Sequence, residues 1–168
     1  VISVDAFPDA PDVDETEPTL RGNAWLKADA LARHTGLPTI ADDTGLEVDA
    51  LDGRPGVYSA RYAGPEADPA ANRALLLSEL AEAASRTARF RCVIAYRNGD
   101  EQESFDGVCE GQITREERGA GGFVYDPIFQ PEGFHETFAE LDAERKNAIS
   151  HRGRALEAFK SYLAKHLD

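Results

Sequence analysis

The stretch Ala41-Asp42-Asp43-Thr44-Gly45-Leu46 places two adjacent carboxylates beside a short apolar run. Residues 38–41 are typical of a short buried strand, and Gly45 signals a turn after it. Because strand side chains alternate between two faces, Asp42 and Asp43 are expected to point in opposite directions. One carboxylate can then face a cleft, bind Mg²⁺ or accept a proton from water, while its neighbour holds the loop. An Asx turn that closes the strand explains the same residues without any chemistry.

The composition is that of a globular protein with a strong acidic excess. Of the 168 residues, 42% are hydrophobic and 29% charged, and the net charge is −13. This length predicts a single domain, 1–168, that can bury a core. No apolar run reaches the roughly 18 residues of a membrane span or resembles a secretory signal, so we expect a cytoplasmic protein without a membrane partner. The acidic excess argues against nucleic acid as a partner, because a duplex-binding surface needs clustered Lys and Arg.

Two alternating runs that flank Asn98-Gly99 predict a long β-hairpin. A two-residue turn at Asn98-Gly99 sets Cys92 opposite Phe105. Cys92 and Cys109 are then roughly 13 Å apart at the rise of a strand. That separation is too large for a disulfide, so both cysteines are expected to be reduced core residues.

The remaining elements follow from apolar spacing, caps and breakers. Strands are expected over 1–4, 38–41 and 47–51, a loop over 5–19, and helices over 23–34, 69–85, 142–148 and from Ser150 onward. A flexible glycine-rich loop, 119–122, leads into the run 123–129. Strands mixed with helices and a long hairpin indicate an α/β fold with a mixed sheet.

An acidic and a basic cluster could carry chemistry. Glu15, Asp42 and Asp43 offer hard carboxylate oxygens that suit Mg²⁺. Substrate phosphates would complete the coordination of such an ion. His151 and Arg152 lie in the first turn of the last expected helix, where free N–H groups favour an anion or a carbonyl oxygen. Basic residues are better placed at a helix C-terminus, so this local conflict favours a function.

The glycine-rich loop precedes aromatic residues that could bind a base. Phe123 and Tyr125 beside a mobile loop can stack on a purine, with Asp126 next to them. An ordinary strand with core aromatic residues explains the same pattern. Lys146 taken alone is typical of a surface lysine.

Taken together, these residues resemble the inosine triphosphate pyrophosphatase family, which hydrolyses non-standard purine nucleoside triphosphates. The resemblance extends from about Glu15 to the C-terminus, and five motifs in the same order make it specific. The motifs are Asn23-Ala24 with Lys27, Ala41-Asp42-Asp43-Thr44-Gly45-Leu46, Pro55-Gly56-Val57-Tyr58-Ser59-Ala60-Arg61-Tyr62, Gly122-Phe123 with Tyr125-Asp126-Pro127-Ile128-Phe129, and Lys146-Asn147-Ala148-Ile149-Ser150-His151-Arg152.

The resemblance implies an elongated central mixed sheet, two lobes with the active cleft between them, and a homodimer. It also implies Mg²⁺-dependent cleavage of dITP, ITP or XTP to the monophosphate and pyrophosphate. By motif, Asp43 is the general base and a metal ligand, Glu15 the second metal ligand, Asp42 their support, and Thr44 a substrate contact. The base pocket implied in the same way consists of Phe123, Val124, Tyr125, Asp126, Lys146, His151 and Arg152.

This chain departs from the family pattern in three places. It begins at what resembles the second strand of the family, so a Thr/Ser-Gly-Asn-x-x-Lys phosphate loop is expected upstream of Val1. Gly22 replaces a usual Glu, which is expected to weaken metal binding. Val124 replaces a usual Gly, and its β-branched side chain is expected to crowd the base.

Two alternatives remain open at this stage. A Maf-type pyrophosphatase shares the general architecture and would prefer modified pyrimidine nucleotides. The chain could also be a truncated nucleotide-binding or dimerisation remnant without activity. A Nudix hydrolase is not supported, because the helical box of paired glutamates is missing.

Overall fold

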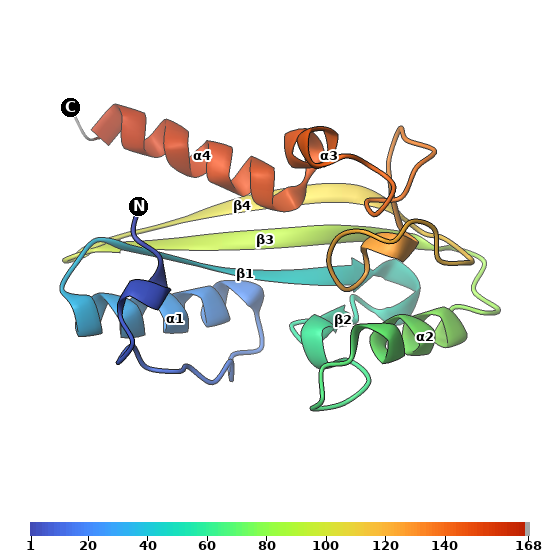
Figure 1. Ribbon diagram of the computed structural model, residues 1–168, viewed down its shortest axis with the longest axis horizontal. Coiled ribbons are helices and arrows are strands. Elements are labelled where there is room, and N and C mark those ends of the chain that lie inside the picture. The colour runs from blue at the N-terminus through green and yellow to red at the C-terminus, as the bar shows by residue number, and fades with distance from the viewer. Residues whose placement is uncertain (167–168) are drawn as a thin grey trace.

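The computed structural model describes residues 1–166, which form an elongated α/β fold (Figure 1). The helices are α1 (Leu20–Thr35), α2 (Pro69–Glu79), α3 (Ala143–Ile149) and α4 (His151–His166). The strands are β1 (Thr39–Val48), β2 (Pro55–Gly56), β3 (Thr87–Asn98), β4 (Glu101–Ile113) and β5 (Phe129–Pro131). Among these residues, no helix is both long and apolar enough to cross a bilayer.

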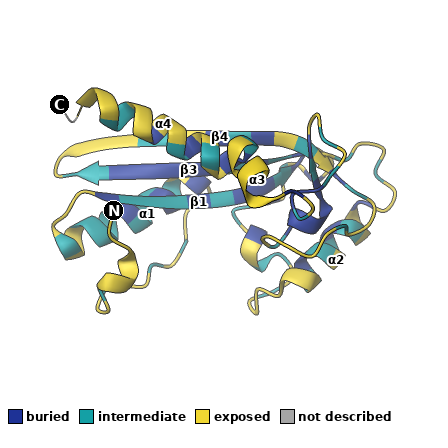
Figure 2. Cartoon of the chain, turned by 45° about the horizontal axis from the view of Figure 1, so that its top comes forward, coloured by how far each residue is buried: buried dark blue, intermediate teal, exposed yellow. Residues whose placement is uncertain are grey.

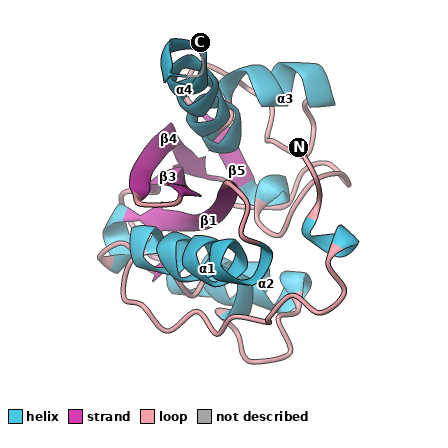
Figure 3. Cartoon of the chain, turned by 90° about the vertical axis from the view of Figure 1, so that its left-hand side faces the viewer, coloured by secondary structure: helices cyan, strands magenta, loops and turns pink. Residues whose placement is uncertain are grey.

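The strands form one sheet in the order β2-β1-β3-β4-β5. Helix α1 packs on one face at one end of the long strands, and α2 with β2 lies at the other end, which gives the two expected lobes (Figure 1). Helix α4 covers the opposite face, as the end-on view shows (Figure 3). Every strand pair in the described part is antiparallel, so the expectation of a mixed sheet is wrong.

Strand β1 is continuous through the two aspartates, where two separate short strands were predicted. All ten residues of β1 pair with β3, and Gly45 lies opposite Arg91. Gly45 marks a close approach of two backbones and not a turn. A Cβ atom built on it would lie 2.5 Å from the carbonyl oxygen of Gly56 in β2. The segment 49–51 leaves the sheet as a short 3₁₀ helix.

The β3–β4 hairpin is confirmed, but its register differs from the prediction by two residues. Asn98 pairs with Glu101, so the turn residues are Gly99 and Asp100, and Gly99 takes the positive φ of +58°. Cys92 therefore lies opposite Gly107. A shift of two residues keeps every side chain on its predicted face. Both cysteines are buried and free, as predicted.

Helix α1 begins three residues earlier than predicted, because Thr19 caps it. The Thr19 hydroxyl accepts a hydrogen bond from the Gly22 amide at 3.0 Å. Asn23, the predicted cap, is a buried residue inside the helix, and its side-chain oxygen accepts from the Glu17 amide at 2.9 Å. Gly36 ends the helix in the left-handed conformation, as predicted.

Three other predicted boundaries can be checked. Helix α2 ends at Glu79 and not at Ser85, because the Arg86 guanidinium donates to the Leu80 carbonyl at 2.7 Å and satisfies it outside a helix. Residues 1–4 are not a strand, and Val4–Ala6 forms a 3₁₀ helix. The Ser150 hydroxyl accepts from the Gly153 amide at 3.1 Å, which confirms it as the cap of α4.

Alternation along the sheet sorts the core into two faces. Cys92 and Ile94 of β3 pack with Ala155 of α4, whereas Val93 and Ala95 pack with α1. Strand β3 is consequently buried over most of its length (Figure 2). The largest cluster lies in the lobe of α2 and β5.

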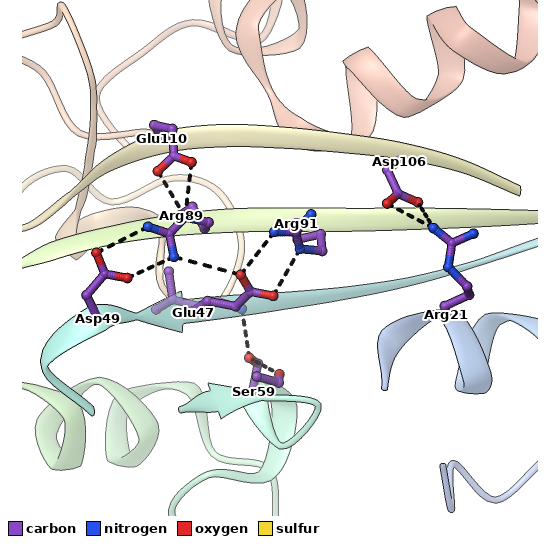
Figure 4. A network of polar contacts seen from close by, with 10 residues as sticks. Arg21, Glu47, Asp49, Ser59, Arg89, Arg91, Asp106 and Glu110 are labelled. Atoms are coloured by element: carbon purple, nitrogen blue, oxygen red, sulfur yellow. Dashed lines mark hydrogen bonds and ion pairs between the residues drawn. The ribbon is translucent and has the colours of Figure 1, made fainter. Parts of the chain in front are cut away.

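Charged side chains link the three long strands on the face that carries α1 (Figure 4). Arg89 binds Asp49 at 2.9 Å and Glu110 at 3.0 Å, and Arg91 binds Glu47 at 3.0 Å. Exposed pairs of this kind contribute modestly, at about 0–1 kcal/mol each, so they support the strand register more than the overall stability.

Candidate active site

The two adjacent aspartates of β1 contact different helices. Asp42 accepts hydrogen bonds from the Arg152 guanidinium of α4 at 2.9 and 3.3 Å. Asp43 accepts one from the Lys27 ammonium of α1 at 3.1 Å. The predicted opposite orientation is therefore confirmed, and each face of β1 carries its own polar cluster.

The cluster on the α1 face, here called the carboxylate cluster, consists of Glu15, Lys27 and Asp43. The Lys27 ammonium lies 2.7 Å from a Glu15 oxygen and 3.1 Å from an Asp43 oxygen, so it bridges the two acids. Arg61 approaches Glu15 from the segment after β2, with 4.0 Å between the charged atoms. The anchored start of α1 positions Lys27, since Asn23 binds the Glu17 backbone one helical turn away.

Burial raises the pKa of the Asp43 carboxyl above its ordinary value, and the Lys27 charge opposes this shift. Burial alone would lower the pKa of Lys27, but its bonds to Glu15 and Asp43 raise it. Lys27 therefore stays charged. The second oxygen of Asp43 is buried and has no hydrogen-bond partner within residues 1–166. It is free to take a proton or a metal ion.

A cavity of about 150 Å³ lies on the α4 face, here called the base pocket. Seven predicted site residues line it, namely Thr44, Phe123, Val124, Tyr125, Asp126, His151 and Arg152. The other lining residues are Gly45, Leu46, Ser59, Ala60 and Phe90. The structure therefore brings the aromatic and basic motifs together, although they are far apart in sequence.

His151 is the most buried basic side chain of the pocket, with 8% of it exposed. Its ring stacks on Phe90 at 4.7 Å between centroids. Burial, followed by the charges of Arg152 and Lys146, lowers the pKa of His151 to about 3. The ring is thus neutral, and its Nδ1 has no hydrogen-bond partner in the described chain. A neutral imidazole can present either a donor or an acceptor to a ligand.

Lys146 lies beside the pocket and is not an ordinary surface lysine. It forms an ion pair with Asp126, which is almost fully buried. Asp126 also accepts from the Phe123 amide at 2.7 Å, which fixes the backbone at the end of the glycine-rich loop. The Phe123 ring is 69% exposed and has the Lys146 ammonium 4.9 Å and the Arg152 guanidinium 5.7 Å from its centre. This arrangement leaves an aromatic face open for stacking.

Two predicted pocket residues are held by the protein itself. The Tyr125 hydroxyl donates to the Ser59 carbonyl at 2.6 Å, so the ring lines the wall while its polar end is occupied. Val124 is half-buried, and its carbonyl accepts from Arg73 at 2.8 Å.

The base pocket and the carboxylate cluster do not share one cavity. Glu15 and Asp43 are absent from the pocket lining, and they lie on the other face of β1. Reasoning from the sequence gave no role to Arg61, Arg73 or Phe90, and treated Lys27 only as part of a motif. A charged residue at an inward position of a helix is the signal that could have indicated Lys27 and Arg73. Nothing local marks Phe90.

A two-lobed α/β fold with an aromatic cavity on one face of β1 and a carboxylate cluster on the other indicates the class of proteins that bind small molecules. Within that class, a sequence profile described as the Ham1 family matches residues 1–162. The chain belongs to the Ham1 family. A dITP/XTP pyrophosphatase of Geobacter sulfurreducens is 51% identical over 166 residues, covering 97% of this chain and 83% of that protein. One of Streptomyces coelicolor is 51% identical, covering 94% and 80%.

Solved structures agree with this assignment. The Ham1 protein of Staphylococcus aureus superposes with a TM-score of 0.91 at 42% identity, covering 96% of this chain and 84% of that one. A nucleoside-triphosphatase, dITP/XTP pyrophosphatase, of Mycobacterium abscessus superposes with a TM-score of 0.80 at 45% identity, covering 94% and 82%. The expected family and the two-lobed α/β architecture are thereby confirmed, with an antiparallel sheet in place of the expected mixed one.

Proposed function

We propose that this protein hydrolyses non-standard purine nucleoside triphosphates, namely dITP, ITP and XTP, to the monophosphate and pyrophosphate. Family membership and relatives named dITP/XTP pyrophosphatase support the reaction class. The observation that carries the proposal is the base pocket, where an exposed aromatic ring lies beside a wall of hydrogen-bond donors. A Maf-type activity on modified pyrimidines is disfavoured by the family assignment.

The base pocket distinguishes 6-oxo purines from 6-amino purines. Arg152 has donors only, and the backbone N–H groups at the start of α4 have no intrahelical partners. These donors form hydrogen bonds with a 6-oxo oxygen. A 6-amino group is itself a donor, so it cannot form these bonds and its hydrogens are repelled. Rejection of this kind is strong, because buried polar groups are left unpaired by the wrong base. Phe123 stacks on either ring without distinguishing them.

On the α1 face, Asp43 acts as the general base. Its free oxygen accepts the proton of the attacking water, and its raised pKa brings it closer to the working pH. Lys27 holds the carboxylate in place and supplies a positive charge near the phosphates. Asp42 does not take part in this step, because it lies on the other face of β1, where one of its oxygens binds Arg152. Asp42 instead orients Arg152 toward the base.

Glu15 and Asp43 are the carboxylates that would hold a Mg²⁺ ion together with the substrate phosphates. Mg²⁺ is commonly bound through one or two carboxylates of this kind. No set of three or more acidic, histidine or cysteine side chains in residues 1–166 could hold a metal without the substrate. When bound, the ion offsets phosphate charge and polarises the phosphorus that is attacked. The net charge of −13 makes such an offset necessary for a polyanionic substrate.

A nucleotide that contacts both clusters crosses the edge of β1. Between Thr39 and Gly45, β1 is paired with β3 on one side, whereas β2 reaches only Leu46 and Glu47 on the other. The base lies on the α4 face near Thr44, and the triphosphate passes this edge to reach Asp43. Thr44, whose buried hydroxyl has no partner in the described part of the chain, contacts the substrate at the crossing.

The proposal also includes a homodimeric assembly and a cytoplasmic location, both of which rest on the family resemblance alone. Sedimentation of the purified protein tests the first, and fractionation of cells tests the second.

The test of the function is pyrophosphate release from dITP with Mg²⁺, compared with dATP, dGTP and a modified pyrimidine triphosphate. We expect pyrophosphate and dIMP as products, with dITP and XTP well ahead of dATP. Preference for the pyrimidine would indicate the Maf-type alternative. Binding of dITP without turnover would indicate a remnant that only binds nucleotides.

A further inference from the structure

The base pocket has two walls that come from distant parts of the chain. Ser59 and Ala60, from the segment after β2, form one wall, and residues 123–126, after the glycine-rich loop, form the other. The Tyr125 hydroxyl joins the walls through its bond to the Ser59 carbonyl at 2.6 Å. A second connection runs through α2, which does not line the pocket.

Two consecutive residues of α2 bind one wall each. Asn72 is fully buried and donates to the Ala60 carbonyl at 2.9 Å, behind the first wall. Arg73 donates to the Val124 carbonyl at 2.8 Å, in the second wall. The other side of the Arg73 guanidinium binds Glu117 at 2.8 Å. Only 15% of the Arg73 side chain is exposed, so its bond to the Val124 carbonyl is partly shielded from water, whereas the bond to Glu117 is exposed.

Ordering the segment between Glu117 and Val124, which Arg73 contacts at both ends, costs conformational entropy. Glu117 and Val124 bracket the glycine-rich loop, in which Gly119 and Gly122 both have a φ of +86°. Glycine loses more backbone freedom on ordering than any other residue. Phe123 directly follows this loop and is largely exposed, so its own packing does little to fix it. The two bonds of Arg73 close the loop at both ends.

We propose that Arg73 is a positioning residue that holds the glycine-rich loop closed and so keeps Phe123 and Val124 in place as the wall of the base pocket. Its kinetic consequence rests on the proposed function. Without the bonds of Arg73, a smaller fraction of molecules has a formed pocket, and the apparent affinity for any purine falls by that fraction. The chemistry on the other face of β1 and the choice between purines are unaffected.

The kinetic test is Arg73→Ala. We expect KM to rise about tenfold for both dITP and dATP, the effect of losing one charged hydrogen bond, with kcat within about twofold of the parent. The matched control is Arg54→Ala, which removes an exposed arginine bound to Glu79 on the same helix. The control should leave both constants unchanged. A lower kcat at constant KM in Arg73→Ala would show a role in stability alone and overturn the proposal.

Amide hydrogen exchange gives a readout that does not depend on activity. We expect the hydrogen-bonded amides of Phe123 and Asp126 to exchange faster in Arg73→Ala than in the parent and in Arg54→Ala. Unchanged exchange there would overturn the proposal, even if the parent hydrolyses no nucleotide and the proposed function itself fails. Glu117 is half-exposed, so Glu117→Ala should raise KM by less than about twofold. An effect as large as that of Arg73→Ala would contradict the assignment to the Val124 carbonyl.

Discussion

The two faces of β1 show how one strand can separate two tasks. On the α1 face, Asp43 keeps one buried oxygen free and shares a single lysine with Glu15. On the α4 face, Asp42 is engaged by Arg152 through two guanidinium nitrogens. Adjacent carboxylates of the same residue type therefore differ in what they can do. Asp43 shares an ammonium with a second acid on one face, whereas Asp42 binds a guanidinium that lies beside the pocket on the other.

This difference predicts that chemistry and base choice can be altered independently. Each face has its own helix, its own cation and its own acid, and they are joined through β1 and through the segment 59–61. Substitutions on the α1 face should change kcat, and substitutions on the α4 face should change the ratio of dITP to dATP.

The largest expected effect is that of Asp43→Asn. The amide keeps the size of the side chain, but it cannot accept the proton and its uncharged oxygen is a weaker metal ligand. We expect kcat for dITP to fall by at least roughly 10²-fold, the lower end of general-base contributions. The dITP-to-dATP ratio should stay constant. Steady-state pyrophosphate release measures both, and near-parental turnover would remove Asp43 from the mechanism.

The next effect in size is that of Arg152→Ala on base choice. Loss of one hydrogen bond from a charged group should narrow the difference between dITP and dATP in kcat/KM by about 1–3 kcal/mol. Phe123→Ala is the matched control, because stacking does not distinguish purines and both substrates should weaken together. If Arg152 is only an ion-pair partner of Asp42, its removal will leave the ratio unchanged.

Asp42→Asn is the same substitution at the neighbouring acid, so it compares the two acids directly. Its effect on the choice between dITP and dATP should be smaller than that of Arg152→Ala. The guanidinium stays in place but loses its charged anchor, so we expect the dITP-to-dATP ratio to fall by about tenfold or less. Turnover of dITP at saturation should be close to the parental value. A loss of kcat comparable to that of Asp43→Asn would show that the two faces are not separate.

The last expected effect is on stability rather than activity and comes from His151. Its pKa in the folded protein is about 3, against an ordinary value of 6.5. Between these values the unfolded chain binds a proton that the folded protein excludes, so stability is lost as the pH falls below 6.5. The loss from this group should be about 1.4 kcal/mol per pH unit.

Urea unfolding at pH 7, 6 and 5 measures this dependence. His151→Gln removes the titrating ring and should flatten the curve in that window relative to the parent. A parental free energy of unfolding that is constant from pH 7 to 5 would contradict the buried neutral state of His151.

Much of the architecture could be predicted from the sequence, because its signals are local. Gly36 ends α1, Ser150 caps α4, and Asn98-Gly99 lies at the hairpin, each for steric or hydrogen-bonding reasons that involve near neighbours. The errors had two causes: a distant contact that overrode a local signal, and a nearby contact that the local pattern did not reveal. Gly45 indicated a turn but serves the close approach of β2, and Arg86 ends α2 early by binding Leu80.

The candidate site divides in the same way. Motifs in the sequence indicated both carboxylates and most of the base pocket, and alternation along a strand placed Asp42 and Asp43 on opposite faces. Alternation depends only on backbone geometry, so it holds in any fold that keeps the strand. Only the tertiary structure decided that Lys27 bridges Glu15 and Asp43, that Arg152 engages Asp42, and that Arg73 binds Val124. The two members of each pair come from different segments of the chain. Which charged side chains meet depends on how the helices pack on the sheet, and that packing depends on burial over the whole chain rather than on any short segment.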